Sequence, residues 1–286
     1  MIAIIDGGST KCDWVILENS GNLKLRTTTL GFNPNIINPD FIMQEIDNNQ
    51  ELFSLKSHIE KVFFYGSGCG TPDNSKKVAD EFLKTFPTGD ISVKEDMTAA
   101  AYAAYNGTPA IICILGTGSN SCYFDGNKIR TDLPSLGFLI GDEGSGSALG
   151  KQLLRRFFMK KLPKDMEADF IETYHLTIEE AIRSMYHNPR ANAYLGEFNK
   201  FVAERKKHPY FQNMVFDEMK NFLDYQVLPY PEAGEVEINF IGYIAYIYED
   251  ILRAAAAELN LKIGKVVQKP IESLVEYHKK YLLNLE

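Results

Sequence analysis

The sequence predicts a two-domain α/β protein whose domains arose by duplication, and three observations support this prediction. The chain has 286 residues, of which 45% are apolar, and this is enough for two packed cores. Strand and helix patterns alternate in the first hundred residues. A glycine-rich, three-strand pattern near the N-terminus recurs from residue 112. We expect an N-terminal domain over 1–106, a C-terminal domain over 107–270, and a helix over 271–286 that returns to the N-terminal domain.

Five strand patterns occur in the N-terminal domain, with helical patterns between them. Asp73 is expected to cap a helix that runs to about residue 86, and the alanine-rich stretch 97–105 favours a second helix. This interleaving predicts a layered α/β domain. The strand patterns cover 2–6, 14–18, 24–30, 61–65 and 91–95.

The internal repeat is the strongest evidence for duplication. Residues 4–10 read Ile-Ile-Asp-Gly-Gly-Ser-Thr and lead into a strand, a turn at 19–22 and another strand. Residues 112–120 read Ile-Cys-Ile-Leu-Gly-Thr-Gly-Ser-Asn and lead into a strand, a turn at 125–127 and a strand through residue 129. Chance can produce two glycine-rich hairpins, but the shared order of elements favours duplication.

After residue 145 the chain becomes mainly helical, which predicts a helical insertion in the C-terminal domain. Pro229, Tyr230 and Pro231, with Gly234 after them, form the clearest candidate linker. Helices are expected at 147–160, 178–186, 191–206, 211–225, 245–259 and 271–283, and strands at 236–241 and 263–268.

Charge and composition favour a small soluble partner. The net charge is −8, so the average field repels nucleic acid and anionic lipid. We expect a cytoplasmic protein, because no secretory leader pattern opens the sequence and its richest apolar stretch, 240–248, is far too short to cross a bilayer. The four cysteines lack C-x-x-C spacing, which favours reduced core thiols; they are Cys12, Cys69, Cys113 and Cys122.

Two glycine-rich turns are candidates for binding phosphate. Glycine has no Cβ to keep an anion away from backbone N–H groups, and neighbouring hydroxyls add donors. Each turn alone is equally consistent with an ordinary hairpin, but together they could hold a polyphosphate across a cleft. The first contains Gly7, Gly8, Ser9 and Thr10, and the second Gly116, Thr117, Gly118 and Ser119.

Carboxylates lie beside these turns. Asp6 ends the first strand, where it could hold Mg²⁺ through water or act as a turn residue. Asp96 follows the strand at 91–95 and is either a general base or the N-cap of the next helix. Asp142 and Glu143 lie among glycines directly before a helix, with Ser145 as a candidate cap. The sequence has no P-loop motif and no G-x-S-x-G motif.

The two glycine-rich turns and the segments that begin at Asp96 and Gly141 form four motifs along the chain. In their order they resemble the signature of the BadF/BadG/BcrA/BcrD ATPase family, most closely its N-acetylglucosamine kinase branch. The resemblance covers about the first half of the chain. It implies two duplicated actin-like ATPase (ribonuclease H-like) domains with ATP and Mg²⁺ in the cleft between them. It also implies phosphorylation of an amino sugar, at O6 in N-acetylglucosamine. The motifs are the runs 6–11, 96–100, 116–120 and 141–145.

The same resemblance implies a role for individual residues. Asp96 would be the base, Asp6 would hold Mg²⁺ through water, and Gly242 would lie on the adenosine side, where Tyr243 is bulkier than the family pattern. The segment 134–138 also departs from the family pattern. Asn33 matches a sugar-binding residue, with Asn35 as an alternative register. ATP phosphates would contact Gly7, Gly8, Ser9, Thr10, Lys11, Gly116, Thr117 and Gly118, and the sugar would contact Asn33, Ser119, Asn120, Asp142 and Glu143.

Two other functions are compatible with these motifs. The family includes ATPases that activate CoA-ester dehydratases through an iron–sulfur cluster at a dimer interface, for which Cys69 and Cys113 are the candidate ligands. A non-catalytic sugar or nucleotide sensor is the other alternative, although the chain shows no attached DNA-binding segment. A homodimer is compatible with the kinase as well as with the activator.

Overall fold

The computed structural model describes residues 1–8, 11–35, 38, 40–87 and 89–285. The chain separates into two compact units. Unit 1 comprises Met1–Tyr105 together with Pro270–Glu286, and unit 2 comprises Asn106–Lys269. The chain therefore leaves unit 1, completes unit 2, and then returns to unit 1.

Unit 1 is built on a five-stranded sheet with the order β3-β2-β1-β4-β5. The first three strands form an antiparallel meander, and β4 and β5 run parallel to β1. The carboxyl ends of β1, β4 and β5 therefore meet at one edge of the sheet. The strands are β1 (Ile2–Gly7), β2 (Lys11–Leu17), β3 (Leu23–Leu30), β4 (Lys61–Gly66) and β5 (Asp90–Glu95).

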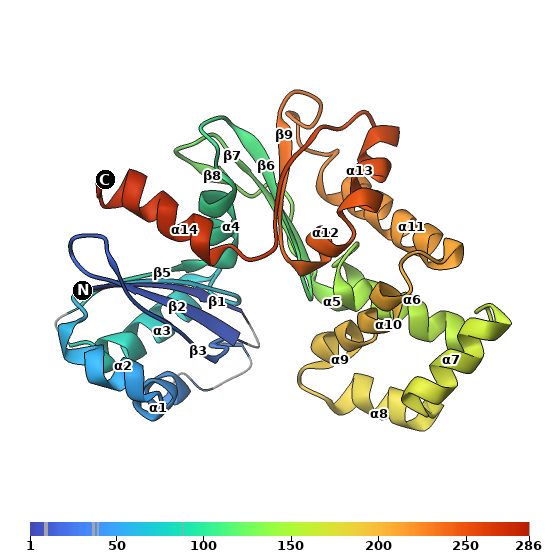
Figure 1. Cartoon of the computed structure of the whole chain (residues 1–286), viewed down its shortest axis with the longest axis horizontal. Helices are drawn as coiled ribbons and strands as arrows, with labels where there is room; N and C mark the ends of the chain where they lie inside the picture. Colours follow the sequence, from blue (N-terminus) through green and yellow to red (C-terminus); the bar gives the residue numbers. More distant parts are fainter. Residues whose placement is uncertain (9–10, 36–37, 39, 88, 286) are drawn as a thin grey trace. The chain divides into compact units, whose positions relative to one another are not determined.

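Helices cover both faces of this sheet (Figure 1). On one face lie α1 (Asp40–Asn48), α2 (Gln50–Leu55) and α3 (Pro72–Thr85), with a short 3-10 turn at Lys56–His58. A cluster of aromatic rings that includes Trp14, Phe32, Phe64 and Phe82 fills the core against this face. Burial of these large rings stabilises unit 1.

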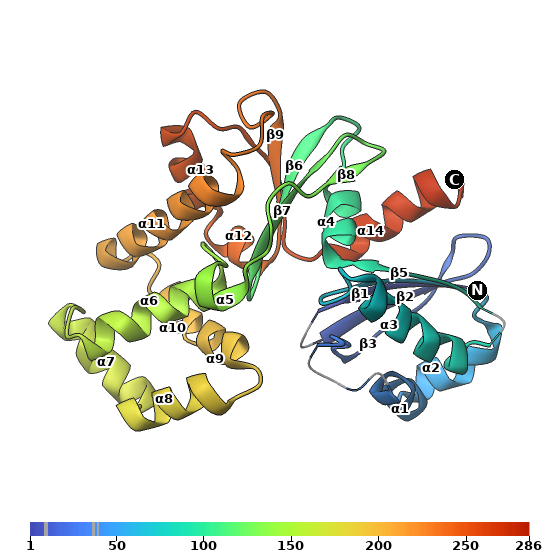
Figure 2. The ribbon, with the colours of Figure 1, turned by 180° about the vertical axis from the view of Figure 1, so that it is seen from behind.

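The other face carries α4 (Asp96–Ala104) and α14 (Ile271–Tyr277), which lie side by side in both views (Figures 1 and 2). Helix α14 continues as a π turn, His278–Leu282. The buried His278 ring and the Tyr65 hydroxyl are hydrogen-bonded at 2.8 Å, and burial lowers the pKa of His278 to about 3. The neutral imidazole therefore attaches the C-terminal helix to β4.

Unit 2 repeats the sheet of unit 1. Its strand order is β10-β9-β6-β7-β8, with an antiparallel β6-β7-β8 meander and with β9 and β10 parallel to β6. The prediction of two duplicated actin-like ATPase domains is thereby confirmed. The strands are β6 (Ala110–Leu115), β7 (Ser119–Phe124), β8 (Ile129–Arg130), β9 (Glu237–Ile241) and β10 (Ile263–Val267).

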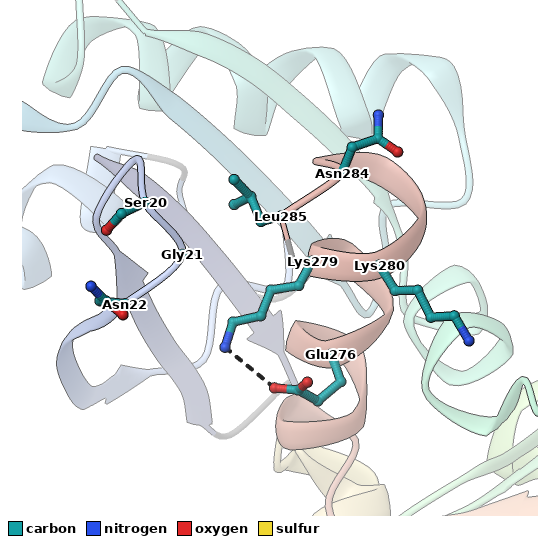
Figure 3. A pocket seen from close by; sticks show the side chains of 8 residues that line it. All are labelled: Ser20, Gly21, Asn22, Glu276, Lys279, Lys280, Asn284 and Leu285. Atoms are coloured by element: carbon teal, nitrogen blue, oxygen red, sulfur yellow. Dashed lines mark hydrogen bonds and ion pairs between the residues drawn. The ribbon is translucent and has the colours of Figure 1, made fainter.

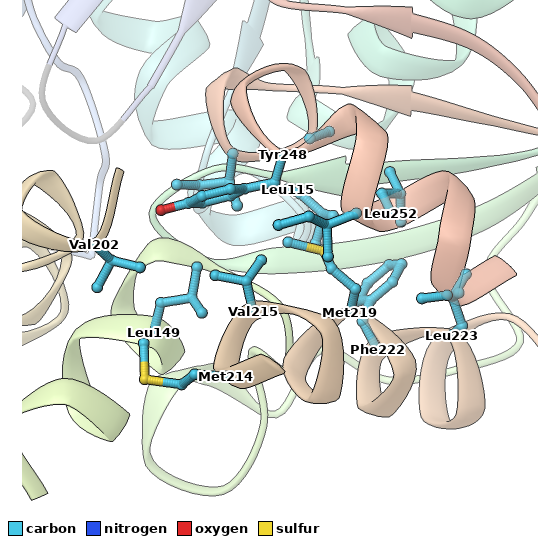
Figure 4. Close-up of a cluster of buried hydrophobic side chains, with 14 of the residues drawn as sticks. Leu115, Leu149, Val202, Met214, Val215, Met219, Phe222, Leu223, Tyr248 and Leu252 are labelled. Atoms are coloured by element: carbon cyan, nitrogen blue, oxygen red, sulfur yellow. The ribbon is translucent and has the colours of Figure 1, made fainter. Parts of the chain in front are cut away.

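Helices make up the rest of unit 2, and α11 lies at the centre of its core. Leu115 from the sheet and Phe222 from α11 lie in one apolar cluster with side chains of α6 and α13 (Figure 4). The expected helical insertion is present as α7 to α10, packed around α6. The helices are α5 (Gly137–Ile140), α6 (Gly146–Phe158), α7 (Lys164–Tyr174), α8 (Ile178–His187), α9 (Ala191–Glu197), α10 (Asn199–Glu204), α11 (Pro209–Gln226), α12 (Tyr243–Ile247) and α13 (Glu249–Glu258).

Four local predictions are wrong, and the first is the single helix at 191–206, which the structure divides at Phe198 into α9 and α10. Helix α3 is capped by Thr71, whose Oγ1 accepts from Asn74 N, and Asp73 lies inside the first turn. The stretch 245–259 is not one helix, because α12 and α13 are separated at the buried Tyr248. The segment 229–234 is not a linker, since Tyr230 is only 2% exposed and packs in the unit 2 core. Within the part of the chain that the structure describes, none of the helices has the length and hydropathy that crossing a membrane requires.

Candidate active site

Three aspartates lie along the carboxyl edge of the unit 1 sheet, but they do not form a group that could hold a metal ion by themselves. Asp6 is the penultimate residue of β1, and Asp13 is its pairing partner on β2. Asp96 directly follows β5. The pKa of Asp6 is raised to about 7, mainly by burial and also by the negative charges of Asp96 and Asp13, while Lys11 lowers it. This edge therefore favours a proton or a cation.

The Asp96 carboxylate is held by two hydrogen bonds. Ser67 Oγ donates to Oδ2 at 2.8 Å, and Met97 N donates to Oδ1 at 2.9 Å. Burial raises the pKa of Asp96, and these two hydrogen bonds lower it. The N-cap position of α4 belongs to Glu95, so Asp96 is the first helical residue and not the cap.

The turn after β1 is closed by a hydrogen bond from Gly8 N to Lys11 O at 2.9 Å. A Cβ on Gly7 would lie 2.6 Å from the Phe64 ring, so packing alone explains a glycine at position 7. The Lys11 ammonium donates to Asp13 Oδ1 at 2.6 Å, which places its charge at the acidic edge. The predicted phosphate-binding residues Ser9 and Thr10 lie outside the described residues.

The second glycine turn packs against the start of α6 in unit 2. Gly146 N donates to Gly116 O at 2.8 Å, and Ser147 N donates to Thr117 O at 3.1 Å. These two N–H groups of the helix N-terminus are therefore used by the turn itself. The Thr117 side chain is exposed, and an added Cβ on Gly116 would meet only open space. This side of the turn is sterically free for a ligand.

The Gly-Asp-Glu-Gly loop is fastened to the same turn through Asp142. Its Oδ1 accepts from Ser119 N at 3.2 Å, and its backbone has a left-handed φ of 61°. An added Cβ on Gly118 would lie 2.9 Å from Asp142 Oδ2, so the glycine makes room for this carboxylate. Burial raises the pKa of Asp142. Glu143, next in the loop, is partly buried.

A buried glutamate on α11 supports this loop from behind. Glu218 Oε2 accepts from Gly144 N at 3.4 Å, and its Oε1 accepts from Gln152 Nε2 at 2.9 Å. Burial raises the pKa of Glu218, whereas both hydrogen bonds lower it. Glu218 thus links α11, α6 and the loop that carries Asp142.

Ser119 and Asn120 are neighbours at the start of β7, so their side chains lie on opposite faces of the sheet. The Ser119 hydroxyl is buried and has no hydrogen-bond partner among the described residues. Asn120 Oδ1 accepts from Ser121 N at 2.9 Å. The side chains of Ser119 and Asn120, both predicted to bind the sugar, therefore point to opposite faces of the sheet.

Asn33 and Asn35 lie in one loop after β3. Asn33 Oδ1 accepts from Asn35 N at 2.9 Å, and Asn35 Oδ1 accepts from Asn74 Nδ2 at 2.8 Å. Asn33 is partly buried and Asn35 is exposed.

Gly242 follows β9 and has a φ of +123°. An added Cβ would lie 2.3 Å from Leu115 O, so only glycine fits between β9 and β6 at this point. Tyr243 beside it is 53% exposed. The bulky ring noted in the sequence therefore projects from the surface and does not fill the core.

A separate hollow of about 820 Å³ lies between the β2–β3 turn and the C-terminal segment (Figure 3). Gly21 and Leu285 line it from the two sides, and Lys279 is already paired with Glu276. Strand pairing places this turn beside the start of β1, at the opposite end of the strand from Asp6. The hollow is thus remote from the acidic edge.

The model of the BadF/BadG/BcrA/BcrD ATPase family matches residues 5–208, which is more than two thirds of the chain. The chain belongs to this family. The family resemblance of the four motifs is thereby confirmed. No curated protein gives a significant match.

Solved structures related to this family member include two proteins named as putative N-acetylglucosamine kinases. The one from Porphyromonas gingivalis is 35% identical, with 98% of this chain and 99% of that chain covered and a TM-score of 0.91. The one from Chromobacterium violaceum is 15% identical, with coverages of 96% and 98% and a TM-score of 0.73. A ROK family glucokinase from Streptomyces griseus, in complex with glucose and AMPPNP, is 14% identical, with coverages of 96% and 97% and a TM-score of 0.51. The last two similarities show the shared fold alone.

Sequence reasoning missed three residues that support the candidate site: Ser67, which contacts Asp96, Asn74, which contacts Asn35, and Glu218, which contacts Gly144. Ser67 lies in the run Gly66–Gly70, in which Cys69 was the residue predicted to have a functional role. Its glycine neighbours were a usable signal, because a hydroxyl between glycines can approach a ligand or a carboxylate closely. Asn74 and Glu218 sit within ordinary helices, and only tertiary structure reveals their partners.

Proposed function

We propose that this chain is an ATP-dependent sugar kinase. The observation that carries the proposal is the partly buried Asp96 carboxylate, oriented by Ser67 at the acidic edge of an ATPase-family sheet. The 35% identity to a protein named as an N-acetylglucosamine kinase, over almost the whole length of both chains, supports the same conclusion.

Asp96 is the proposed general base. In phosphoryl transfer most of the catalysis comes from positioning and electrostatics, and a carboxylate accepts the proton of the attacking hydroxyl. The hydrogen bonds from Ser67 and Met97 N fix both oxygens, so the carboxylate meets the substrate in one orientation. Its raised pKa makes it a better proton acceptor than an exposed aspartate.

ATP phosphates are the proposed ligands of the glycine turns. In unit 2, Gly116 to Gly118 offer the exposed Thr117 hydroxyl and an open space beside Gly116. In unit 1, the turn from Gly7 to Lys11, with the predicted Ser9 and Thr10, has the same proposed role. Gly242 would lie on the adenosine side.

Asp6 suits a hydrated Mg²⁺. Among the described residues no cluster of three or more metal-ligating side chains is found. Mg²⁺ in phosphotransferases is usually held by one or two carboxylates together with water and substrate phosphates. Asp6 and Asp96 repel each other, and the pKa of Asp6 is about 7, so a cation would relieve an existing electrostatic cost. When bound, the ion would neutralise charge that develops on the transferred phosphoryl group.

An amino sugar is the proposed acceptor, with N-acetylglucosamine and its O6 hydroxyl as the specific candidates. Polar side chains on turns can form directed hydrogen bonds to ring hydroxyls and an acetamido group. Ser119 supports this role, because its buried hydroxyl has no partner among the described residues and burying such a group is costly. The proposed sugar ligands are Asn33, Ser119, Asn120, Asp142 and Glu143.

The cysteines argue against the cluster-dependent activator. Cys69 and Cys113 are 3% and 0% exposed, so neither thiol is presented for a cluster shared between subunits. Burial also raises the pKa of Cys69 to about 12, which disfavours the thiolate that iron requires.

The test is an ADP-release assay with ATP and Mg²⁺ in the presence of N-acetylglucosamine, glucosamine, N-acetylmuramic acid or glucose. We expect sugar-dependent ADP release, fastest with N-acetylglucosamine, and a product whose phosphorus NMR spectrum identifies the phosphorylated hydroxyl. Loss of ADP release in Asp96→Asn, with retention in Asp90→Asn at the start of the strand that precedes Asp96, would support Asp96 as the base. ADP release that no sugar accelerates would overturn the kinase assignment.

A further inference from the structure

Three segments of unit 1 meet at the first turn of α3. The loop after β3 contributes Asn35, the loop after β4 contributes Gly68, and α3 contributes Asn74. Asn74 Nδ2 donates to Asn35 Oδ1 at 2.8 Å and to Gly68 O at 2.9 Å. Both hydrogens of one amide group are therefore used to join two loops that are more than thirty residues apart in sequence.

The start of α3 holds Asn74 in place. Thr71 Oγ1 accepts from Asn74 N at 3.3 Å, and Pro72 occupies the first turn. Proline has a fixed φ that suits the first helical turn, and the cap satisfies an N–H that would otherwise lack a partner. Asn74 is thus anchored by its backbone while its side chain reaches both loops.

The two loops also touch directly, and this contact depends on Gly68. Its φ is +83°, and an added Cβ would lie 2.3 Å from Asn33 Oδ1 and 2.8 Å from Asn35 Nδ2. Glycine is therefore required where the asparagine loop packs on the second loop.

The residue before Gly68 is Ser67, which orients Asp96 through its hydroxyl. One loop consequently supports the proposed base through Ser67 and, one residue later, the asparagine loop through Gly68. We propose that Asn74 is a positioning residue that fixes the Asn33–Asn35 loop relative to Asp96, and thereby sets how the sugar is presented to the base. This inference rests on the proposed sugar kinase function.

Positioning of this kind has a characteristic kinetic signature. Small displacements between a substrate and a catalytic group reduce rates strongly, because the reacting atoms must be aligned. Loss of Asn74 should weaken sugar binding and also lower kcat. It should leave the ionisation of Asp96 unchanged, because Asn74 takes no part in the Ser67–Asp96 hydrogen bond, and ATP binding should also be unchanged.

The experiment compares Asn74→Ala with Ser75→Ala. Ser75 Oγ donates to Cys69 O at 2.6 Å, so it holds the same loop after β4, and within the described part of the chain its side chain has no hydrogen bond to the asparagine loop. For Asn74→Ala we expect a KM for N-acetylglucosamine at least about 10-fold higher, the loss that removal of one or two hydrogen bonds implies. We also expect kcat to fall several-fold, a KM for ATP within twofold, and an unshifted acid limb of the pH–rate profile. Ser75→Ala should keep the sugar KM within about threefold.

A second variant covers the case in which Asn74→Ala does not fold. Asn74→Leu keeps the branching and the number of side-chain heavy atoms, has a higher helix propensity and also lacks both hydrogen bonds, so it should show the same kinetics. Emission from Trp14, the single tryptophan, reports whether Phe32 next to the asparagine loop stays packed. Calorimetric titration with N-acetylglucosamine alone should show the affinity loss without turnover.

The two proposals fail in different ways. If the wild-type protein phosphorylates no sugar, the kinase assignment and this inference fall together. If the wild-type enzyme is active and Asn74→Ala and Asn74→Leu keep wild-type sugar KM and kcat, only the positioning role is overturned. Equal sugar KM increases in Asn74→Ala and Ser75→Ala would also overturn it, because they would show that general support of the loop after β4 is what matters.

Discussion

The Ser67 hydroxyl donates to Asp96 Oδ2 at 2.8 Å, while the Ser67 backbone N–H donates to Gly7 O at 2.8 Å. One residue thus connects the end of β1 to the proposed base. A hydrogen bond to an ionised carboxylate stabilises the charged form, and the raised pKa of Asp96 is lower than burial alone would make it.

Ser67→Ala should raise the pKa of Asp96, because the carboxylate loses a donor and keeps its burial. Since the base must be ionised, the acid limb of kcat/KM should move to higher pH. Ser67→Thr retains the hydroxyl and should restore the limb toward its wild-type position. An acid limb at the wild-type pH in Ser67→Ala would show that this hydrogen bond does not affect the pKa of Asp96.

Asp96→Asn should lower turnover by about 10²–10⁴, the range associated with loss of a general base. Affinities for ATP and sugar should remain within a few-fold, because the amide keeps the size of the carboxylate. Single-turnover kinetics and calorimetry separate these two effects. Near-normal turnover in Asp96→Asn would restrict Asp96 to a structural role at the start of α4.

Asp6→Asn should stabilise the ligand-free protein at alkaline pH. The folded-state pKa of Asp6 is about 7, above the ordinary 3.8, so its contribution to stability is fully present below about pH 4 and is lost as pH rises through 7. The amide avoids this loss, which a shift of this size limits to about 4 kcal/mol, but burying the amide has a cost of its own. At pH 8 Tm should therefore rise by at least about 2–4 °C.

At pH 4 the melting temperatures of wild type and Asp6→Asn should agree. Mg²⁺ with ATP should stabilise the wild-type protein more than the variant. A Tm difference between the two proteins that does not change with pH would contradict the assignment of this effect to Asp6 ionisation.

Gly118→Ala and Gly116→Ala should differ sharply although they lie two residues apart. A Cβ on Gly118 would lie 2.9 Å from Asp142 Oδ2, so the carboxylate must shift and its bond with Ser119 N should weaken. We expect at least about a 10-fold loss of sugar affinity and a lower Tm. Gly116→Ala adds its methyl group to open space, so Tm should be unchanged while ATP affinity falls.

Scanning calorimetry and ATP titration on these two variants measure both effects. Unchanged ATP affinity in Gly116→Ala would mean that phosphate does not approach the open side of this turn.

The sheets were predictable because their signals are local. Alternating apolar residues and glycine turns within 2–30 and 112–129 specify each meander, and their repetition predicts the duplicated fold. The breaks in the helices were not predictable in this way. The split at Tyr248 arises from a buried ring whose hydroxyl donates to Asn199 Oδ1 at 2.9 Å, a partner 49 residues away.

The site shows the same division between local and distant information. Asp6 and Asp96 could be found because each follows a strand pattern, and strand ends carry functional residues in α/β folds. Glu218 could not be found from the sequence, because an acidic residue on an amphipathic helix such as α11 is common and gives no sign of a buried role. Its role comes from Gly144 and Gln152, which approach it only in the folded unit.

The return of α14 to unit 1 affects the order in which the chain can fold during synthesis. His278 and Leu274 fill the face of the sheet beside α4, yet they are translated after all of unit 2. On the ribosome, residues 1–105 therefore keep an uncovered apolar surface until the last helix is synthesised. The residues of unit 2 are contiguous, so unit 2 can fold first. A nascent chain arrested before residue 270 should bind chaperones through this surface, and release of the last helix should end that dependence.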